Sequence, residues 1–97
     1  MKKLDKRIKC NGFYYDLIKR TDRKAMYQSD SGFYEVFIVR IQEANEGTFE
    51  GVKVIFEHKE LFPKNEDFGS TAWCYSTGRN KMTAFDLAER KYELLPE

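Results

Sequence analysis

Apolar and polar residues alternate in several short runs along the first three quarters of this 97-residue chain, and helical spacing replaces the alternation near its end. In the strongest run, residues 33–41, both sets of alternate positions are largely apolar. A strand of this kind belongs in the middle of a sheet, with the helix over one face and loops or a partner chain over the other. The runs predict strands at residues 13–20, 25–28, 33–41, 52–57 and 71–76.

The end of the chain has the pattern of an amphipathic helix. Thr83 is suited to cap its first turn together with Asp86, three residues later, and Pro96 marks its end. An apolar stripe of this spacing packs on a sheet, and its members are Phe85, Ala88, Tyr92 and Leu95. We therefore expect an α+β fold: an antiparallel sheet of about five strands that begins as a meander, with one C-terminal helix packed on one face.

Three segments between these elements are expected to be irregular. Residues 42–51 are expected to form the longest loop, and residues 77–81 a turn. The loop at residues 62–69 begins at Phe62-Pro63, ends at Gly69, and leads into the strand that holds the only tryptophan, Trp73. Pro fixes φ and Gly enters positive φ freely, and loops with a fixed path on a rigid scaffold often carry function.

Length and composition predict one domain over residues 1–97, with a basic, flexible segment at 1–11 and a folded body at 12–95. The chain has 41% hydrophobic residues, too many for a disordered protein. It contains no apolar run of the length that a signal peptide or a membrane span requires, so a cytoplasmic location is expected. Cys10 and Cys74 lack metal-binding or disulfide spacing and are expected to be free thiols.

The net charge of +1 is unevenly distributed. Residues 1–24 hold nine Lys/Arg against three Asp, whereas residues 25–97 hold eight Lys/Arg against thirteen acidic residues. A basic front and an acidic remainder favour binding to a polyanion or to further copies of the chain. The alternative is that both are ordinary solvated faces.

Nucleic acid is the first specific partner that the residues suggest, because cations neutralise phosphates and exposed rings stack on unpaired bases. The hypothesis assigns the phosphate contacts to Lys19, Arg20, Arg23 and Lys24. It assigns base stacking to Tyr14 or Tyr15. In the alternative interpretation, these rings lie in the core and the cations only keep the surface soluble.

A protein partner, or a second copy of the chain, is the alternative partner. One Trp, six Tyr and eight Phe are more aromatic residues than one sheet and one helix easily cover, and Tyr and Trp are enriched at interfaces. This hypothesis places the contact at the loop of residues 62–69 and at the residues Phe62, Phe68, Trp73 and Tyr75.

Catalysis is not expected. His58 is the only histidine, and no nucleophile or substrate site accompanies it in the pattern. Glu66 and Asp67 lie together, but their spacing is not that of a calcium loop, so no metal and no cofactor are expected.

The chain resembles small uncharacterised proteins of bacteriophages and mobile elements of Bacteroides-type bacteria. The resemblance covers most of residues 12–95 and lies in the runs 13–22, 25–27, 34–37 and 65–69 with Ala72-Trp73. It implies a cytosolic accessory role and carries over no catalytic residues. A second resemblance, through Gly69, Trp73 and the late helix, is to the WGR domain, a nucleic-acid-binding module. Cys74 stands where that family has Gly-Arg, so its DNA-binding role is not transferred.

Overall fold

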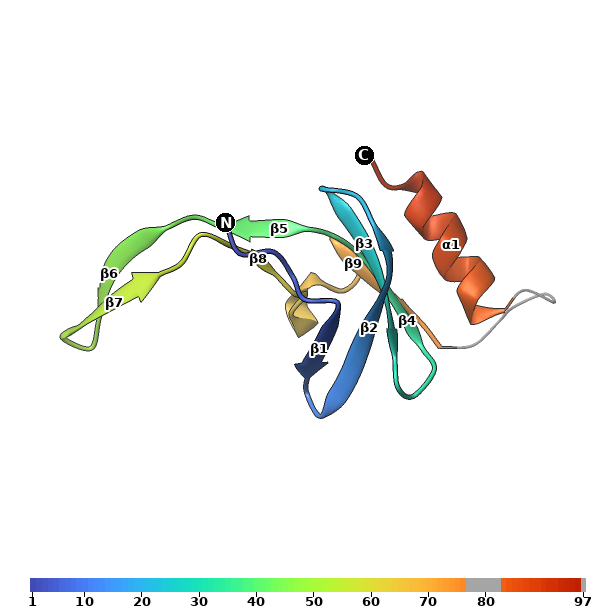
Figure 1. Ribbon diagram of the computed structural model, residues 1–97, viewed down its shortest axis with the longest axis horizontal. Helices are drawn as coiled ribbons and strands as arrows, with labels where there is room; N and C mark the ends of the chain where they lie inside the picture. The colour runs from blue at the N-terminus through green and yellow to red at the C-terminus, as the bar shows by residue number, and fades with distance from the viewer. Residues whose placement is uncertain (77–82, 97) are drawn as a thin grey trace.

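The computed structural model describes residues 1–76 and 83–96. Within them, a five-stranded antiparallel sheet carries one C-terminal helix, which confirms the predicted α+β fold (Figure 1). In sheet order, the strands are β1 (Arg7–Cys10), β2 (Phe13–Arg20), β3 (Lys24–Ser29), β4 (Tyr34–Ile38) and β9 (Ala72–Tyr75). Strands β2 to β4 form the predicted meander. The turn expected at residues 77–81 lies outside the described residues.

Helix α1 (Ala84–Leu94) covers one face of this sheet, over β3, β4 and β9. The Asp86 N–H donates to Thr83 Oγ1 at 3.1 Å and the Thr83 N–H donates to the Asp86 carboxylate at 3.3 Å, which confirms the predicted cap. Under the helix lies a buried cluster of Met26, Val36, Ala88, Tyr92 and Leu95. Phe85 departs from the predicted stripe, because its ring is half exposed and lies edge-on to Tyr34.

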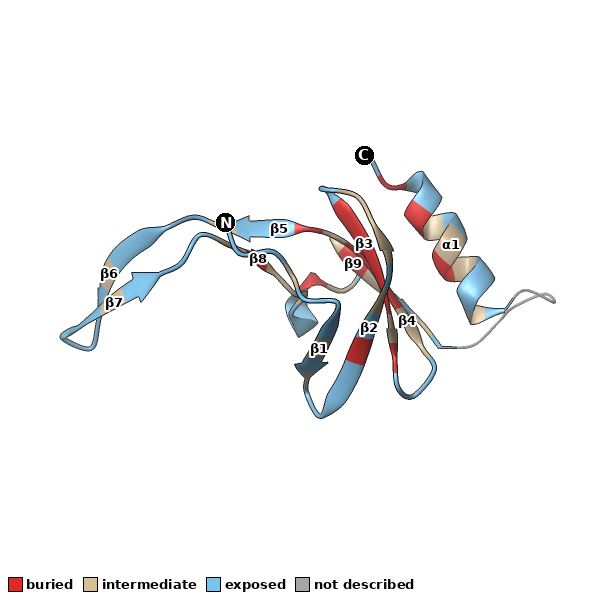
Figure 2. Cartoon of the chain, viewed as in Figure 1, coloured by how far each residue is buried: buried red, intermediate tan, exposed pale blue. Residues whose placement is uncertain are grey.

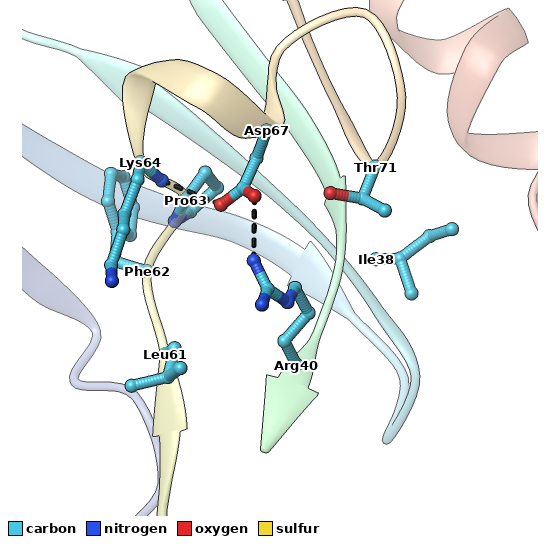
Figure 3. Close-up of a pocket in the computed structure, with 8 residues that line it drawn as sticks. All are labelled: Ile38, Arg40, Leu61, Phe62, Pro63, Lys64, Asp67 and Thr71. Atoms are coloured by element: carbon cyan, nitrogen blue, oxygen red, sulfur yellow. Dashed lines mark hydrogen bonds and ion pairs between the residues drawn. The ribbon is translucent and has the colours of Figure 1, made fainter. Parts of the chain in front are cut away.

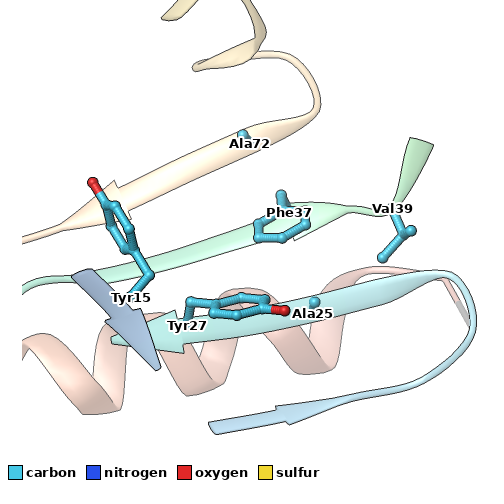
Figure 4. Close-up of a cluster of buried hydrophobic side chains, with 6 residues drawn as sticks. All are labelled: Tyr15, Ala25, Tyr27, Phe37, Val39 and Ala72. Carbon is cyan, nitrogen blue, oxygen red and sulfur yellow. The ribbon is translucent and has the colours of Figure 1, made fainter. Parts of the chain in front are cut away.

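The opposite face of the sheet is covered by the chain itself. Its buried cluster consists of Tyr15, Ala25, Tyr27, Phe37, Val39 and Ala72 (Figure 4). The ring of Phe62 closes this cluster, with centroids 5.1, 5.5 and 5.4 Å from Tyr15, Tyr27 and Phe37. Strand β4 is therefore covered on both faces, as its double apolar pattern predicts.

A second unit, which we call the arm (residues 40–61), projects from this body (Figure 1). Its base pairs β5 (Arg40–Gln42) with β8 (Lys59–Leu61), and its tip is the hairpin of β6 (Asn45–Phe49) and β7 (Val52–Phe56). The molecule measures 55 × 29 × 23 Å as a result. Burial is concentrated in the five-stranded sheet and on the inner side of the helix, whereas the arm tip is exposed along nearly its whole length (Figure 2).

The arm overturns three expectations. Residues 42–51 do not form a loop, because most of them pair in β5 and β6. The strand expected at 33–41 ends at Ile38, because residues 40–42 leave the main sheet and pair with β8 as β5. The strand expected at 52–57 exists as β7, but its partner is β6 and not the main sheet. Alternation predicts a strand without predicting its neighbour.

The N-terminal segment, expected to be flexible, contains β1, which pairs with β2 along its full length. Lys2 also exchanges backbone hydrogen bonds with the arm: its N–H donates to the His58 carbonyl at 3.0 Å and its carbonyl accepts from Glu60 at 2.8 Å. The N-terminus therefore lies beside the base of the arm (Figure 1). In the described part of the chain, no helix has both the length and the apolar character needed to cross a membrane.

Candidate functional site

The arm tip is an amphipathic hairpin whose apolar side chains share one face. Asn45 lies opposite Phe56, Gly47 opposite Val54, and Phe49 opposite Val52. Directly opposed residues of an antiparallel pair project to the same side. Four apolar side chains, which we call the apolar arm face, therefore lie together: Phe49, Val52, Val54 and Phe56. Phe49 is 69% exposed, Val52 65% and Phe56 43%.

The other face of the hairpin is mostly polar. Glu46 lies opposite Ile55, and Thr48 lies opposite Lys53. The Lys53 Nζ is 3.4 Å from the Glu46 carboxylate in an exposed ion pair. Ile55, 70% exposed, is the apolar residue on this side. Phe49 and Ile55 are therefore exposed to nearly the same extent on opposite faces of the hairpin. Phe49 lies within the apolar arm face, whereas Ile55 lies among polar side chains.

Two glycines determine the local shape of the arm tip. Glu50 and Gly51 have φ values of 51° and 79°, the pair of left-handed residues that a tight two-residue hairpin turn requires. Gly47 lies beneath the ring of Phe56, whose Cε2 is 3.8 Å from where a Cβ would be. The turn sets the register, and the register places the four apolar side chains on one face.

The base of the arm is anchored by a buried ion pair. The Arg20 guanidinium on β2 donates to both Glu60 carboxylate oxygens on β8, at 2.7 and 2.8 Å. The Leu4 N–H donates to the same carboxylate at 2.9 Å, and the Glu60 side chain is only 2% exposed. The hydrogen bonds from Arg20 hold the pKa of Glu60 below its ordinary value, against the opposing effect of burial.

The loop at residues 62–69 is a second anchor. It contains the 3-10 turn η1 (Asn65–Asp67), and the buried Asp67 accepts from the Lys64 N–H at 2.8 Å. The same carboxylate accepts from the Arg40 guanidinium on β5 at 2.6 Å (Figure 3). The fixed path that Pro63 and Gly69 predict is present, and what it positions is the arm.

The residues predicted to form a protein interface are mostly used inside the molecule. Phe62 and Phe68 pack against the buried cluster of Figure 4. Trp73 and Tyr75 pack against the cluster under the helix, and the Lys91 ammonium lies 4.0 Å above the Trp73 ring. All four side chains are half-buried, and none belongs to the arm tip.

The residues predicted to contact nucleic acid do not form one surface. Lys24 is buried and its ammonium donates to the carbonyls of Tyr92 and Leu95, at 2.9 and 3.2 Å, at the end of helix α1. Tyr15 is buried, Arg20 binds Glu60, and Lys19 pairs with Glu89 of the helix. Arg23 is exposed at the turn between β2 and β3, and Tyr14 is exposed on β2.

Tyr14 has basic neighbours that sequence reasoning did not assign to it. The Arg7 guanidinium lies 4.5 Å from its ring centroid and the Lys9 ammonium 5.5 Å, both from β1. Arg7 also makes two hydrogen bonds of 2.8 Å to Asp16. We call Arg7, Lys9 and Tyr14 the basic face. Helix α1 packs on β3, β4 and β9, so β1 lies at the end of the sheet away from it.

Glu35 is a carboxylate buried among aromatic and thiol groups. Burial raises its pKa, and a smaller opposite effect comes from its hydrogen bond with Tyr15. Its Oε2 has no hydrogen-bond partner among the described residues. Burial and the nearby Glu35 also raise the pKa of the Cys74 thiol. Cys10 and Cys74 are both free thiols, as expected.

Groups suited to catalysis are dispersed. Among the described residues, no three His, Cys, Asp or Glu side chains come close enough to hold a metal ion. His58 lies 3.8 Å from Glu43 at the exposed base of the arm. The enclosed pocket beside Arg40 and Asp67 measures about 10 Å³, space for one water molecule (Figure 3). Of the exposed large apolar side chains in the described residues, four lie on the arm tip: Phe49, Val52, Ile55 and Phe56.

No protein-family model, curated protein or solved structure matches this chain. Sequence reasoning missed the arm tip, although a signal was present: Glu50-Gly51 stands between Thr48-Phe49 and Val52, a turn pair between strand formers.

Proposed function

We propose that this protein is a non-enzymatic protein-binding module whose contact site is the apolar arm face. The observation that carries the proposal is that Phe49, Val52 and Phe56 are exposed together on one side of a projecting hairpin. An isolated two-stranded hairpin is at best marginally stable in water. Clustered exposed apolar side chains mark interaction sites. A partner that covers this face would stabilise the hairpin and would remove its apolar side chains from water.

The charge of the arm favours a protein over a nucleic acid. Residues 42–57 contain four glutamates and one lysine, a net charge of −3. Phosphates would be repelled by this segment, whereas a basic and partly apolar protein surface would be attracted to it. The anchors Arg20–Glu60 and Arg40–Asp67 hold the base of the arm, so the tip is presented in a defined direction.

Site-specific crosslinking in the producing cell tests this proposal. A photoreactive p-benzoylphenylalanine replaces Phe49 in one variant and Ile55 in a matched control, both on the arm tip and both highly exposed. We expect discrete protein adducts from position 49 and few or none from position 55. An absence of adducts at position 49, or the same adducts from both positions, would refute the proposal.

The basic face supports a second candidate function, nucleic-acid contact. Tyr14 is exposed and has Arg7 and Lys9 over its ring, an arrangement suited to a base stacked beside phosphate-neutralising cations. The test is anisotropy of labelled single- and double-stranded oligonucleotides at about 50 and 200 mM salt. Binding that collapses at the higher salt and falls with Tyr14→Ala supports this function. Equal binding by Tyr14→Ala, or no binding, contradicts it.

A further inference from the structure

We propose that the partner of the arm is a second copy of this chain, and that the arm of each protomer lies on the basic face of the other. This inference rests on the proposed function, because it names the protein that the apolar arm face binds. Two properties of the described residues point to it: opposite charge on the two surfaces, and exposed apolar groups on both.

The two surfaces have complementary charge. The arm segment 42–57 has a net charge of −3, whereas the rest of the chain has a net charge of +4. At the basic face, Arg7 and Lys9 are exposed and Asp16 pairs with Arg7, which leaves a net charge of +1; Asp5, Lys6 and Asp30 are exposed nearby. The surface that the acidic arm requires in a partner is thus present on the chain itself.

Both surfaces also have apolar area to bury. On β2, Tyr14 is 39% exposed and Ile18 is 41% exposed. Ile18 lies at the irregularity in β2, where the pairing with β3 shifts between Leu17 and Lys19. On the basic face itself, Phe49 and Val52 of a second copy would meet the exposed ring of Tyr14 and not only charge.

The size of a stable interface favours a reciprocal arrangement. Specific interfaces bury about 800 Å² on each partner, more than one face of a hairpin with two five-residue strands supplies. Two-fold symmetry makes every contact twice, because each protomer contributes both an arm and a basic face. A projecting arm with an anchored base is suited to reach across to a neighbour in this way (Figure 1).

Molar mass in solution is the first test. We expect light scattering after size exclusion to give a dimer of the full chain at about 100 µM protein, with weaker association at about 500 mM salt. Phe49→Ser should raise the dimer dissociation constant at least about tenfold, and Ile55→Ser should leave it unchanged. A monomer under all these conditions would refute the inference, while adducts to another protein from position 49 would still support the proposed function.

A charge exchange tests which surfaces meet. One variant carries Glu50→Lys and Glu57→Lys on the arm, and the other carries Lys6→Glu and Lys9→Glu near the basic face; all four positions are exposed. Each variant alone should be monomeric, because like charges then oppose each other. Their mixture should dimerise, since both contacts become complementary again. Variants that dimerise alone as the unaltered chain does, or a mixture that stays monomeric, would refute the arm-to-face arrangement.

Discussion

Arg20 and Glu60, forty positions apart in the sequence, form a bidentate ion pair with hydrogen bonds of 2.7 and 2.8 Å. Their side chains are 17% and 2% exposed. The pair joins β2 of the main sheet to β8 at the base of the arm. The direction in which the arm projects therefore depends on a contact inside the body, and not on the arm tip itself.

Breaking this pair should destabilise the whole fold. Glu60→Ala leaves the Arg20 guanidinium uncompensated and removes the acceptor of the Leu4 N–H, so we expect a loss of about 3 kcal/mol in the free energy of unfolding. Urea denaturation followed by Trp73 fluorescence measures it. Asp16→Ala is the matched control, because the Arg7–Asp16 pair has the same chemistry with side chains 56% and 52% exposed.

The control should lose at most about 1 kcal/mol, because water and salt screen an exposed pair. The double variant Arg20→Met with Glu60→Leu should recover most of the stability, since apolar side chains replace both buried charges. Equal losses of unfolding free energy for Glu60→Ala and Asp16→Ala would show that the buried pair stabilises the fold no more than the exposed pair does.

Lys24, on β3, should stabilise the C-terminal end of helix α1. Its ammonium donates to the carbonyls of Tyr92 and Leu95 and lies 4.3 Å from the Tyr92 ring centroid. Lys24→Met removes these bonds at the helix C-terminus, where a cation is also favoured by the helix dipole, and should cost about 2 kcal/mol. Arg23→Met, at the exposed neighbouring position, should cost less than half as much. Amide hydrogen exchange in the last turn of α1 should rise in the first variant only.

The stability of the fold should respond to the ionisation of Glu35. Burial raises its pKa above the ordinary value of 4.5, so the folded state holds this proton more tightly than the unfolded state. Its stabilising contribution is therefore complete below pH 4.5 and is lost as the pH rises through the pKa of the folded state. Glu35→Gln, which stays neutral, should be more stable than the unaltered chain at pH 7.

This advantage of Glu35→Gln should shrink and vanish as the pH falls toward 4.5. Glu60 should show the opposite dependence, because Arg20 lowers its pKa: its contribution is present above pH 4.5 and is lost as the pH falls through the pKa of the folded state. Urea unfolding of Glu35→Gln and of a second variant, Glu60→Gln, between about pH 3 and 8 checks the two signs. A difference between Glu35→Gln and the unaltered chain that does not vary with pH would contradict the assignment.

Local patterns in the sequence predicted most elements of the main body, but not β1, which lies in the segment expected to be flexible. The alternation over 13–20 and 25–28 and the pair Thr83 and Asp86 each depend on residues close in the chain, and the structure confirms the strands and the helix cap. Partners distant in sequence were not predictable. Lys24 and Arg20 were expected to be surface cations because nothing near them indicates that Leu95 and Glu60 satisfy them.

The arm was missed for a similar reason. Residues 42–51 are acidic and contain two glycines, a composition typical of loops, and Glu-Gly is a weaker turn signal than Asn-Gly or Asp-Gly. The strand β6 becomes recognisable only when β7 is placed beside it. The predicted interface therefore consisted of aromatic residues that pack against the core. It did not include the exposed aliphatic and aromatic residues of the hairpin.

The two glycines of the arm tip should respond to alanine in opposite directions. Gly51 has a φ of 79°, so Gly51→Ala strains the backbone and should cost about 1 kcal/mol within the hairpin. Gly47 lies in a strand, and the Cβ of Gly47→Ala would make an ordinary contact with the Phe56 ring at 3.8 Å. That change should stabilise the hairpin by about 0.5 kcal/mol, because the unfolded chain loses freedom. Amide hydrogen exchange of β6 and β7 measures both effects, with faster exchange expected for Gly51→Ala and slower exchange for Gly47→Ala.

The urea midpoint reported by Trp73 should not move in either variant, because the arm tip opens without the main sheet. A shift of that midpoint with Gly51→Ala would show instead that the arm and the body unfold as one unit.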